Sequence, residues 1–172
     1  IIQTTQPPVN ERIMELLIMI ETAKRAGAAR ITAVLPYFMY SRSDKKDQSR
    51  VPVTAKLVAK ILEAAGTDRV LTCDLHNSAI QAYFDIVCNR VTGKFLLQEY
   101  FKSKNLEDIV VVATDAGSSK KAYKFAEHFN CPIAFGRVNN TCTQRTTWKI
   151  GNSQICFFKT GKRNFICFFG TF

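Results

Sequence analysis

The sequence lacks any apolar run long enough to cross a bilayer, which argues against a membrane-spanning protein. It also lacks a charged N-terminal segment followed by an apolar core, so we expect no secretory signal. Hydrophobic residues make up 47% of the 172 residues and charged residues 22%, which is typical of soluble globular proteins. This length fits one domain, or one domain with part of another.

Closely spaced cysteine pairs are absent as well. None of the six cysteines forms a CxxC pair, so a structural zinc site is not expected. In the absence of a secretory signal, we interpret them as reduced thiols of a cytoplasmic protein. The cysteines are Cys73, Cys88, Cys131, Cys142, Cys156 and Cys167.

Acidic side chains are missing from residues 137–172. This segment holds six of the 24 basic side chains and therefore contributes +6 to the net charge of +10. A basic protein could bind nucleic acid, but that hypothesis requires a basic stripe on an ordered element, and here the excess lies in an irregular tail. We expect neither a nucleic-acid partner nor a membrane partner.

Apolar periodicity predicts two amphipathic helices in the first 66 residues. The first begins with Asn10 as a plausible N-cap and is ended by Gly27. The second follows Pro52 and Thr54 and stops at Gly66. Its predicted inward-facing residues are Leu57, Val58, Ile61, Leu62 and Ala65.

Strands are predicted between these helices and after them. Residues 30–35 and 69–73 are short apolar runs, and the chain opens with what looks like the end of another strand. Residues 79–84 are expected to form a short helix and residues 86–92 a crossing segment. The alternating order predicts an α/β fold with a parallel sheet flanked by helices.

A second strand-turn-helix-strand unit is expected to begin near residue 91. It comprises a helix at 93–104, a strand at 108–113, a helix face at 122–129 and a strand at 131–135. We therefore divide the chain into a near-complete domain at 1–90 lacking its first strands, a partial second domain at 91–136, and a divergent tail at 137–172.

The tail holds two Phe-rich runs, Ile155–Phe158 and Phe165–Phe169. One interpretation is a β-hairpin. The other, which we favour, is sequence that is not native to the fold, from an aberrant reading frame or an intron, and is disordered. If exposed, such apolar runs would promote aggregation.

Polar side chains follow the strand at residues 69–73. Asp74 and His76 come directly after it, at the edge where open α/β sheets bind ligands. An oxygen ligand and an imidazole suit a divalent cation or a phosphate-bearing partner. The alternative is an Asp that caps the next helix and a surface His, and chemistry alone does not separate the two.

Two further segments could bind phosphate. Residues 42–50 place Arg and Lys side chains around Asp44 and Asp47, and Arg forks bind phosphate oxygens well, although a solvated surface loop has the same composition. Residues 115–119 form a Gly-containing turn between a strand and a helix, where backbone amides could hold a phosphate.

Several motifs together resemble one family. Residues 74–76 read Asp-Leu-His, residues 80–85 read Ile-Gln-Ala-Tyr-Phe-Asp, and residues 42–50 read Arg-Ser-Asp-Lys-Lys-Asp-Gln-Ser-Arg. Over about residues 1–136 the sequence resembles the ribose-phosphate pyrophosphokinases, also called phosphoribosyl-diphosphate synthases. The resemblance implies a phosphoribosyltransferase-like fold, truncated at both ends. It also implies Mg²⁺-dependent transfer of diphosphate from ATP to C1 of ribose 5-phosphate, giving phosphoribosyl diphosphate and AMP for nucleotide biosynthesis.

The resemblance also implies roles for individual residues. The ATP loop comprises Arg42, Ser43, Asp44, Lys45, Lys46 and Asp47, with Ser43 where the family has Gln. The metal positions are Asp74, His76 and Asp85, and His76 is also the catalytic candidate near the phosphates. The ribose 5-phosphate positions are Asp115, Gly117 and Ser118, with Ser118 in place of a second Gly. Arg50 and Gln81 match a regulatory phosphate site.

Two features of the family are not found. Val138 and Asn140 stand where its catalytic Lys and Arg are expected, and its phosphoribosyl-binding loop is absent. We therefore expect the activity of this chain to be impaired. The alternative is a catalytically inactive relative that binds nucleotide or joins oligomers as a regulatory subunit. The family implies a homo-oligomer, either a dimer or a hexamer.

Overall fold

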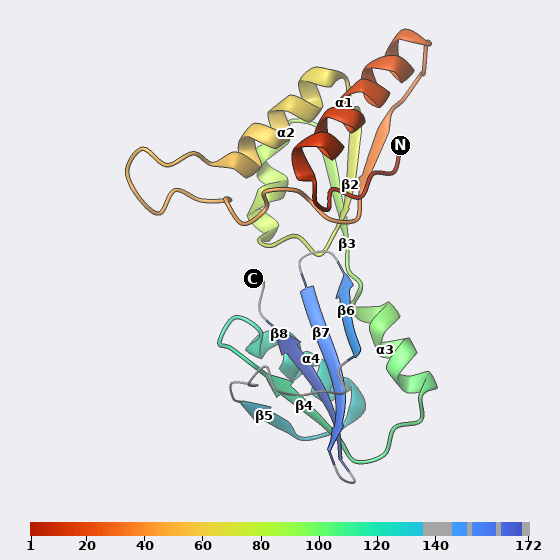
Figure 1. Cartoon of the computed structure of the whole chain (residues 1–172), viewed down its shortest axis with the longest axis vertical. Helices are drawn as coiled ribbons and strands as arrows, with labels where there is room; N and C mark the ends of the chain where they lie inside the picture. Colours follow the sequence, from red (N-terminus) through yellow and green to blue (C-terminus); the bar gives the residue numbers. More distant parts are fainter. Residues whose placement is uncertain (136–145, 151–152, 161–162, 170–172) are drawn as a thin grey trace. The chain divides into compact units, whose positions relative to one another are not determined.

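The computed structural model describes residues 1–135, 146–150, 153–160 and 163–169. The chain divides into two compact units, Ile1–Thr92 and Gly93–Phe172 (Figure 1). Among the described residues, no helix has both the length and the apolar character needed to cross a membrane.

Unit 1 contains a three-stranded sheet in the order β1-β2-β3. These strands are β1 (Thr32–Leu35), β2 (Arg69–Cys73) and β3 (Val87–Val91), and both pairings are parallel. Ile2 adds an isolated parallel bridge to Val34. The predicted parallel sheet is therefore confirmed, and the segment expected only to cross the fold is its edge strand β3.

Two helices of unit 1 supply six of the 14 buried residues in its core cluster. In α1 (Val9–Arg25) the fully buried residues are Leu16 and Ile20, and in α2 (Thr54–Ala65) they include Ala59 and Leu62. Gly66 ends α2 with φ of 105°, a left-handed conformation that favours glycine.

Two sequence predictions about these helices are wrong. Pro8, not Asn10, occupies the N-cap position of α1. Asn10 lies inside the first turn, where its Oδ1 accepts a hydrogen bond from the hydroxyl of Tyr40 at 2.6 Å. Leu57 and Ile61 were expected to point inward, but they are 56% and 37% exposed. The apolar stripe of α2 is wider than the surface that the sheet covers, so only one side of the stripe is buried.

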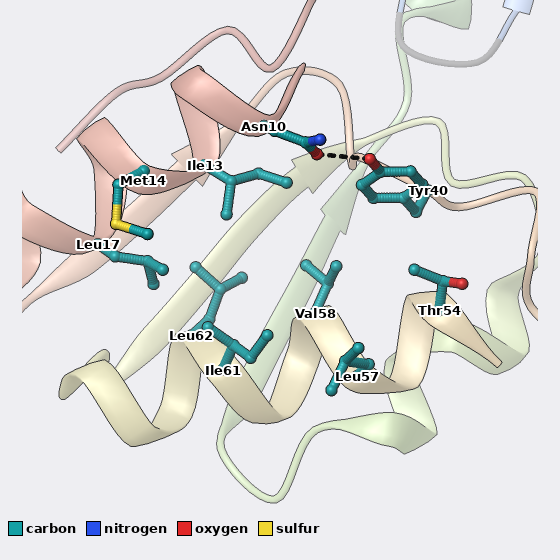
Figure 2. Close-up of a pocket in the computed structure, with 10 residues that line it drawn as sticks. All are labelled: Asn10, Ile13, Met14, Leu17, Tyr40, Thr54, Leu57, Val58, Ile61 and Leu62. Carbon is teal, nitrogen blue, oxygen red and sulfur yellow. Dashed lines mark hydrogen bonds between the residues drawn. The ribbon is translucent and has the colours of Figure 1, made fainter. Parts of the chain in front are cut away.

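The uncovered side of that stripe faces α1 across a groove of about 350 Å³ (Figure 2). Figure 2 shows Met14 and Leu17 of α1 opposite Leu57 and Ile61 of α2, with the Asn10–Tyr40 pair at one end. No candidate phosphate or metal residue lines this groove. It is therefore an apolar surface feature separate from the site predicted at the strand ends.

A 3₁₀ helix, η1 (Ser78–Tyr83), follows β2 and corresponds to the short helix predicted there. Asn77 begins it, since its Oδ1 accepts a hydrogen bond from the Ala79 amide at 3.0 Å. Directly after η1, Phe84 packs edge-on against Phe38 at a ring-centroid distance of 5.8 Å. This contact ties the end of η1 to the segment that follows β1.

Unit 2 contains a mixed sheet in the order β5-β4-β8-β7-β6. Its strands are β4 (Ile109–Ala113), β5 (Ile133–Phe135), β6 (Thr146–Ile150), β7 (Ser153–Thr160) and β8 (Arg163–Phe169). Strand β4 is parallel to β5 and β8, whereas β7 is antiparallel to β8 and β6. The parallel arrangement predicted for the first part of this unit is thus present, joined to antiparallel strands.

The helices of unit 2 are α3 (Lys94–Ser103) and α4 (Ser119–Phe129). Phe101 of α3 and Phe125 of α4 are buried and meet edge-to-face at 5.9 Å. Val111 of β4 and Ile166 of β8 belong to the same core cluster. A residue of the predicted tail is therefore part of this core.

The two Phe-rich runs of the tail lie in β7 and β8, which pair as the hairpin interpretation expected. The interpretation that we favoured, a tail whose sequence is not native to the fold, stays a prediction. The domain division at residues 90 and 136 stays a prediction. The positions Val138 and Asn140, at which catalytic residues are expected by family resemblance, lie outside the described residues.

Candidate functional site

The loop between β1 and α2 is fastened at its base by Ser43. Its Oγ accepts a hydrogen bond from the Thr54 amide at 3.2 Å, and its carbonyl oxygen accepts one from the Ala55 amide at 3.1 Å. The first amides of a helix have no partner within the helix, so these contacts stabilise the start of α2. Ser43, predicted as an ATP residue, therefore has a structural role here.

Beyond this base, the loop projects from unit 1 (orange in Figure 1) and its charged side chains are exposed. Exposed guanidinium and ammonium groups on a protruding loop can contact a polyphosphate without first leaving other partners. The exposed candidates are Arg42, Lys45, Lys46, Asp47 and Arg50.

Asp44 differs from these neighbours because it is buried, with a side chain only 3% exposed. Its Oδ2 lies 3.1 Å from Nδ1 of His76, a residue 32 positions away in the sequence. The Tyr83 hydroxyl donates to the carbonyl oxygen of Asp44. Two predicted site residues from separate motifs, Asp44 and His76, are thus brought together.

Asp74 lies directly after β2 in a left-handed backbone conformation, with φ of 44°. Asp is among the residues that tolerate this region, which often occurs at functional sites. The Thr92 hydroxyl, just after β3, donates to Asp74 Oδ1 at 3.0 Å, and the Asp74 amide donates to the Val91 carbonyl at 3.1 Å. The carboxylate is therefore held at the carboxyl edge of the sheet, as predicted.

Asp85 is not gathered with Asp74 and His76. Its carboxylate, 85% exposed, forms an ion pair with Lys60 Nζ at 2.5 Å, and its amide donates to Glu63 Oε1 at 2.5 Å. The hydrogen bond that Lys60 donates to Asp85, followed by the one that it donates to Glu63, raises the pKa of Lys60. Within the described parts of the chain, no three His, Cys, Asp or Glu side chains form a group that could hold a metal ion.

The predicted regulatory pair is also not joined by a contact. The Gln81 side-chain amide donates to the Cys88 carbonyl at 2.8 Å, so it fastens η1 to β3. Arg50 lies on the exposed part of the loop with φ of 62°. Within residues 1–92, Arg50 makes no hydrogen bond to Gln81.

In unit 2, the turn at Asp115–Ser118 is closed by its own side chains. The Ser118 amide donates to Asp115 Oδ1 at 2.7 Å, and the Ser118 hydroxyl donates to the Asp115 carbonyl at 3.0 Å. A Cβ added at Gly117 would lie 3.3 Å from the same Oδ1. The amide predicted to face a sugar phosphate is therefore directed at the chain's own carboxylate.

Sequence reasoning missed Tyr83 and Thr92. Thr92 had a usable signal, because it follows β3 as Asp74 follows β2, and the carboxyl ends of parallel strands meet at one edge. Tyr83 had no such signal, since its hydroxyl reaches a backbone carbonyl 39 residues away.

These features define an α/β protein. Its first unit carries a carboxylate, Asp74, and an imidazole, His76, at the carboxyl edge of a parallel sheet, and a basic loop contacts His76 through Asp44. Residues 1–66 match the family described as the N-terminal domain of ribose phosphate pyrophosphokinase. Over the part that matches its relatives, the chain belongs to the ribose-phosphate pyrophosphokinase family, and the resemblance noted from its motifs is confirmed.

Individual relatives show the extent of this similarity. The chain is 56% identical over 137 residues to a ribose-phosphate pyrophosphokinase of Clostridium tetani and 54% identical over 134 residues to one of Bacillus caldolyticus. Each match covers 78% of this chain but only 43% and 42% of the relative. The crystal structure of phosphoribosylpyrophosphate synthetase from Mycobacterium smegmatis matches 81% of this chain and 48% of that one, with a TM-score of 0.72 and 40% identity. The chain therefore spans less than half the length of these relatives.

Proposed function

We propose that this chain supplies the ATP-phosphate half-site of a ribose-phosphate diphosphokinase. In the proposed reaction the 1-hydroxyl oxygen of ribose 5-phosphate attacks the β-phosphorus of ATP. The bond from that phosphorus to the α,β-bridging oxygen breaks, AMP leaves, and the hydroxyl proton is released. The observation that carries the proposal is 56% identity to a relative of that name, over a region that includes the basic loop and the strand-end motif.

Within this proposal, the basic loop contacts the polyphosphate. Catalysis of phosphoryl-type transfer rests on positioning and charge neutralisation, which Arg and Lys provide through charge-assisted hydrogen bonds. The exposure of Arg42, Lys45 and Lys46 supports this role. Asp47 remains a proposed ATP contact on the same loop, and Asp115 with Gly117 a proposed ribose 5-phosphate contact.

Mg²⁺ is proposed at the strand end, held by Asp74 and His76. The donor set fits a Mg²⁺ ion that takes one or two carboxylates together with substrate phosphates, because such sites do not need a complete protein cage. When bound, the ion would neutralise charge on the β- and γ-phosphates. Asp85 fits less well, because it is paired with Lys60.

Self-association is proposed for the groove between α1 and α2. Met14, Leu57 and Ile61 line this groove and are between 37% and 58% exposed, and clustered exposed apolar residues often mark a contact surface. A homodimer or a hexamer would cover them. A cytoplasmic location is proposed from the interpretation of the cysteines as reduced thiols, which the free Cys88 and Cys131 support.

A second candidate function is a nucleotide-binding relative without catalytic activity. It is favoured by the self-closed turn at Asp115 and Ser118, which leaves the Ser118 amide without access to a sugar phosphate. In this case the chain binds ATP in unit 1 and acts through association with other subunits.

The decisive experiment measures AMP formation by the purified chain with Mg²⁺, ATP and ribose 5-phosphate. An Asp74→Ala/His76→Ala double variant is the control, and ATP binding is measured on both proteins. AMP that requires the sugar and is lost in the control supports the diphosphokinase. ATP binding without AMP supports the inactive relative, and absence of both contradicts both functions.

A further inference from the structure

Asp44 lies between the part of the basic loop that is hydrogen-bonded to α2 and the part whose side chains are exposed to solvent. On its N-terminal side, Ser43 is hydrogen-bonded to the start of α2. On its C-terminal side, Lys45 and Lys46 are exposed to solvent. The side chain of Asp44 is 3% exposed and turns away from solvent toward His76. Because its side chain is buried, Asp44 does not fit the ATP-binding role that the sequence resemblance implied for the whole loop.

The backbone of Asp44 is held independently of its side chain. The Tyr83 hydroxyl donates to its carbonyl oxygen, and Tyr83 belongs to η1, the element that follows His76 in the chain. Loop and strand end are therefore connected twice, once by Tyr83 and once by the His76 ring. A carboxylate held on both sides in this way has a fixed position before any ligand arrives.

The carboxylate of Asp44 depends on His76 for its stabilisation. Its Oδ1 is buried and has no hydrogen-bond partner among the described residues. Nδ1 of His76 is the one partner that these residues provide for the carboxylate, through Oδ2. A buried carboxylate is costly without a donor, and a carboxylate oxygen can only accept. The hydrogen of the imidazole therefore lies on Nδ1.

We propose that Asp44 is a positioning residue that fixes the orientation and tautomer of His76. With Nδ1 donating to Asp44, the ring nitrogen left for a ligand is Nε2, and the side chain of His76 is 27% exposed. Nε2 then carries no hydrogen, and its lone pair would hold the metal ion of Mg-ATP. This last step rests on the proposed function, whereas the pairing and the tautomer do not.

The tautomer is tested by ¹⁵N NMR of the histidine rings in the full chain at alkaline pH, where the imidazole is neutral. The chain has two histidines, and His128 is exposed, so a His128→Gln variant assigns both rings. We expect His76 in the Nδ1–H form, the less common one in free histidine, and His128 in the Nε2–H form. His76 in the Nε2–H form in the wild-type chain overturns the proposal, and this measurement needs no variant of Asp44.

Two variants of the same loop then test the cause. Asp44→Ala removes the acceptor next to the ring and should shift His76 to the Nε2–H form, while Asp47→Ala, an exposed change three residues away, should leave the tautomer unchanged. Losing a group that orients a ligand residue typically costs about 10- to 100-fold in affinity, so Asp44→Ala should weaken Mg-ATP binding by that factor. An unchanged tautomer in Asp44→Ala overturns the proposal. An Nδ1–H ring in a wild-type chain that binds no ATP leaves the positioning intact and contradicts the proposed function.

Discussion

The two units each place an aspartate within two residues of the end of a parallel strand, but they hold it by different means. In unit 1, the Asp74 carboxylate accepts a hydrogen bond from Thr92, 18 residues away, and His76 is paired with Asp44, 32 residues away. In unit 2, the hydrogen bonds between Asp115 and Ser118 span three residues.

This difference teaches how each turn depends on the rest of its unit. The unit 1 site requires the whole α/β fold to bring the loop, the strand end and Thr92 together. In unit 2, the hydrogen bonds between Asp115 and Ser118 join residues of a single turn at the start of α4. A substitution in the hydrophobic core of a unit should therefore disturb the unit 1 site much more than the unit 2 turn. A substitution within the turn itself should disturb the unit 2 turn and leave the unit 1 site unchanged.

The largest effect is expected for Leu62→Ala in the core of unit 1. Leu62 is fully buried on α2, and removing a buried Leu side chain costs about 2–5 kcal/mol in the free energy of unfolding. Because Ser43 fastens the loop to the start of α2, ATP binding should weaken along with stability. Chemical denaturation and ATP titration measure the two effects.

The matched control is Leu57→Ala on the same helix, since Leu57 is 56% exposed and lies in the groove. It should change stability by less than about 1 kcal/mol. Equal losses for the two leucines would contradict the assignment of the core to one side of the α2 stripe. In addition, Leu57→Glu should reduce the mass of any assembly seen by light scattering if the groove is the proposed self-association surface.

The next effect is expected for Ser118→Ala at the start of α4. Ser118 is buried, and its hydroxyl donates to the Asp115 carbonyl, so losing the hydroxyl should cost about 0.5–1.5 kcal/mol of stability. The damage should stay in the turn, and ATP affinity should remain that of the wild type. A parallel loss of ATP affinity would show that this turn is not self-contained.

Part of this contrast could be predicted from sequence. Period-3.6 patterns located both helices of unit 1, and the run Arg69–Cys73 marked β2 with the bounds seen in the structure. The position of Asp74 and His76 followed from their place after that strand. The local Ser118 contacts were also within reach, because a serine three residues after an aspartate often closes such a turn.

The remainder depended on tertiary contacts that a single sequence does not encode locally. Nothing in the pattern distinguishes buried Asp44 from exposed Asp47, because both lie in one charged run. Strand β8 pairs with β4 across more than 50 residues, and from its Phe-rich composition we favoured an interpretation other than the β-hairpin. The ion pair that occupies Asp85 likewise arises from Lys60 on α2.

A smaller effect is expected for Thr92→Val, which removes the donor to Asp74 and keeps the side-chain shape. A single hydrogen bond contributes about 0.5–1.5 kcal/mol, so Mg²⁺-dependent ATP affinity should fall by up to about tenfold. Ser119→Ala is the control in unit 2, since it also removes one hydroxyl contact, at 2.7 Å to the Ala116 carbonyl. Calorimetric titration of both variants should show a loss of affinity only for Thr92→Val.

The smallest effect concerns one partly buried thiol in each unit, Cys88 and Cys131. Burial raises the pKa of Cys88 in β3 to about 11 from an ordinary value of 9.0. Burial also raises the pKa of Cys131, but there a hydrogen bond from the Val111 backbone favours the thiolate and opposes the shift. Only the thiolate reacts with alkylating reagents, so near pH 9 Cys88 should react more slowly than Cys131, and both more slowly than in the unfolded chain.

The same shift fixes the sign of a pH effect on stability. The folded chain keeps the Cys88 thiol protonated to a higher pH than the unfolded chain does. The stability that the protonated thiol contributes is therefore complete below about pH 9 and is lost as the pH rises toward 11. Cys88→Ala should remove that part of the alkaline decline in the free energy of unfolding, whereas Cys131→Ala should remove less of it. Identical alkylation rates for the two thiols would contradict this prediction. They would mean that Cys88, in the edge strand β3, is more open to solvent than its burial implies.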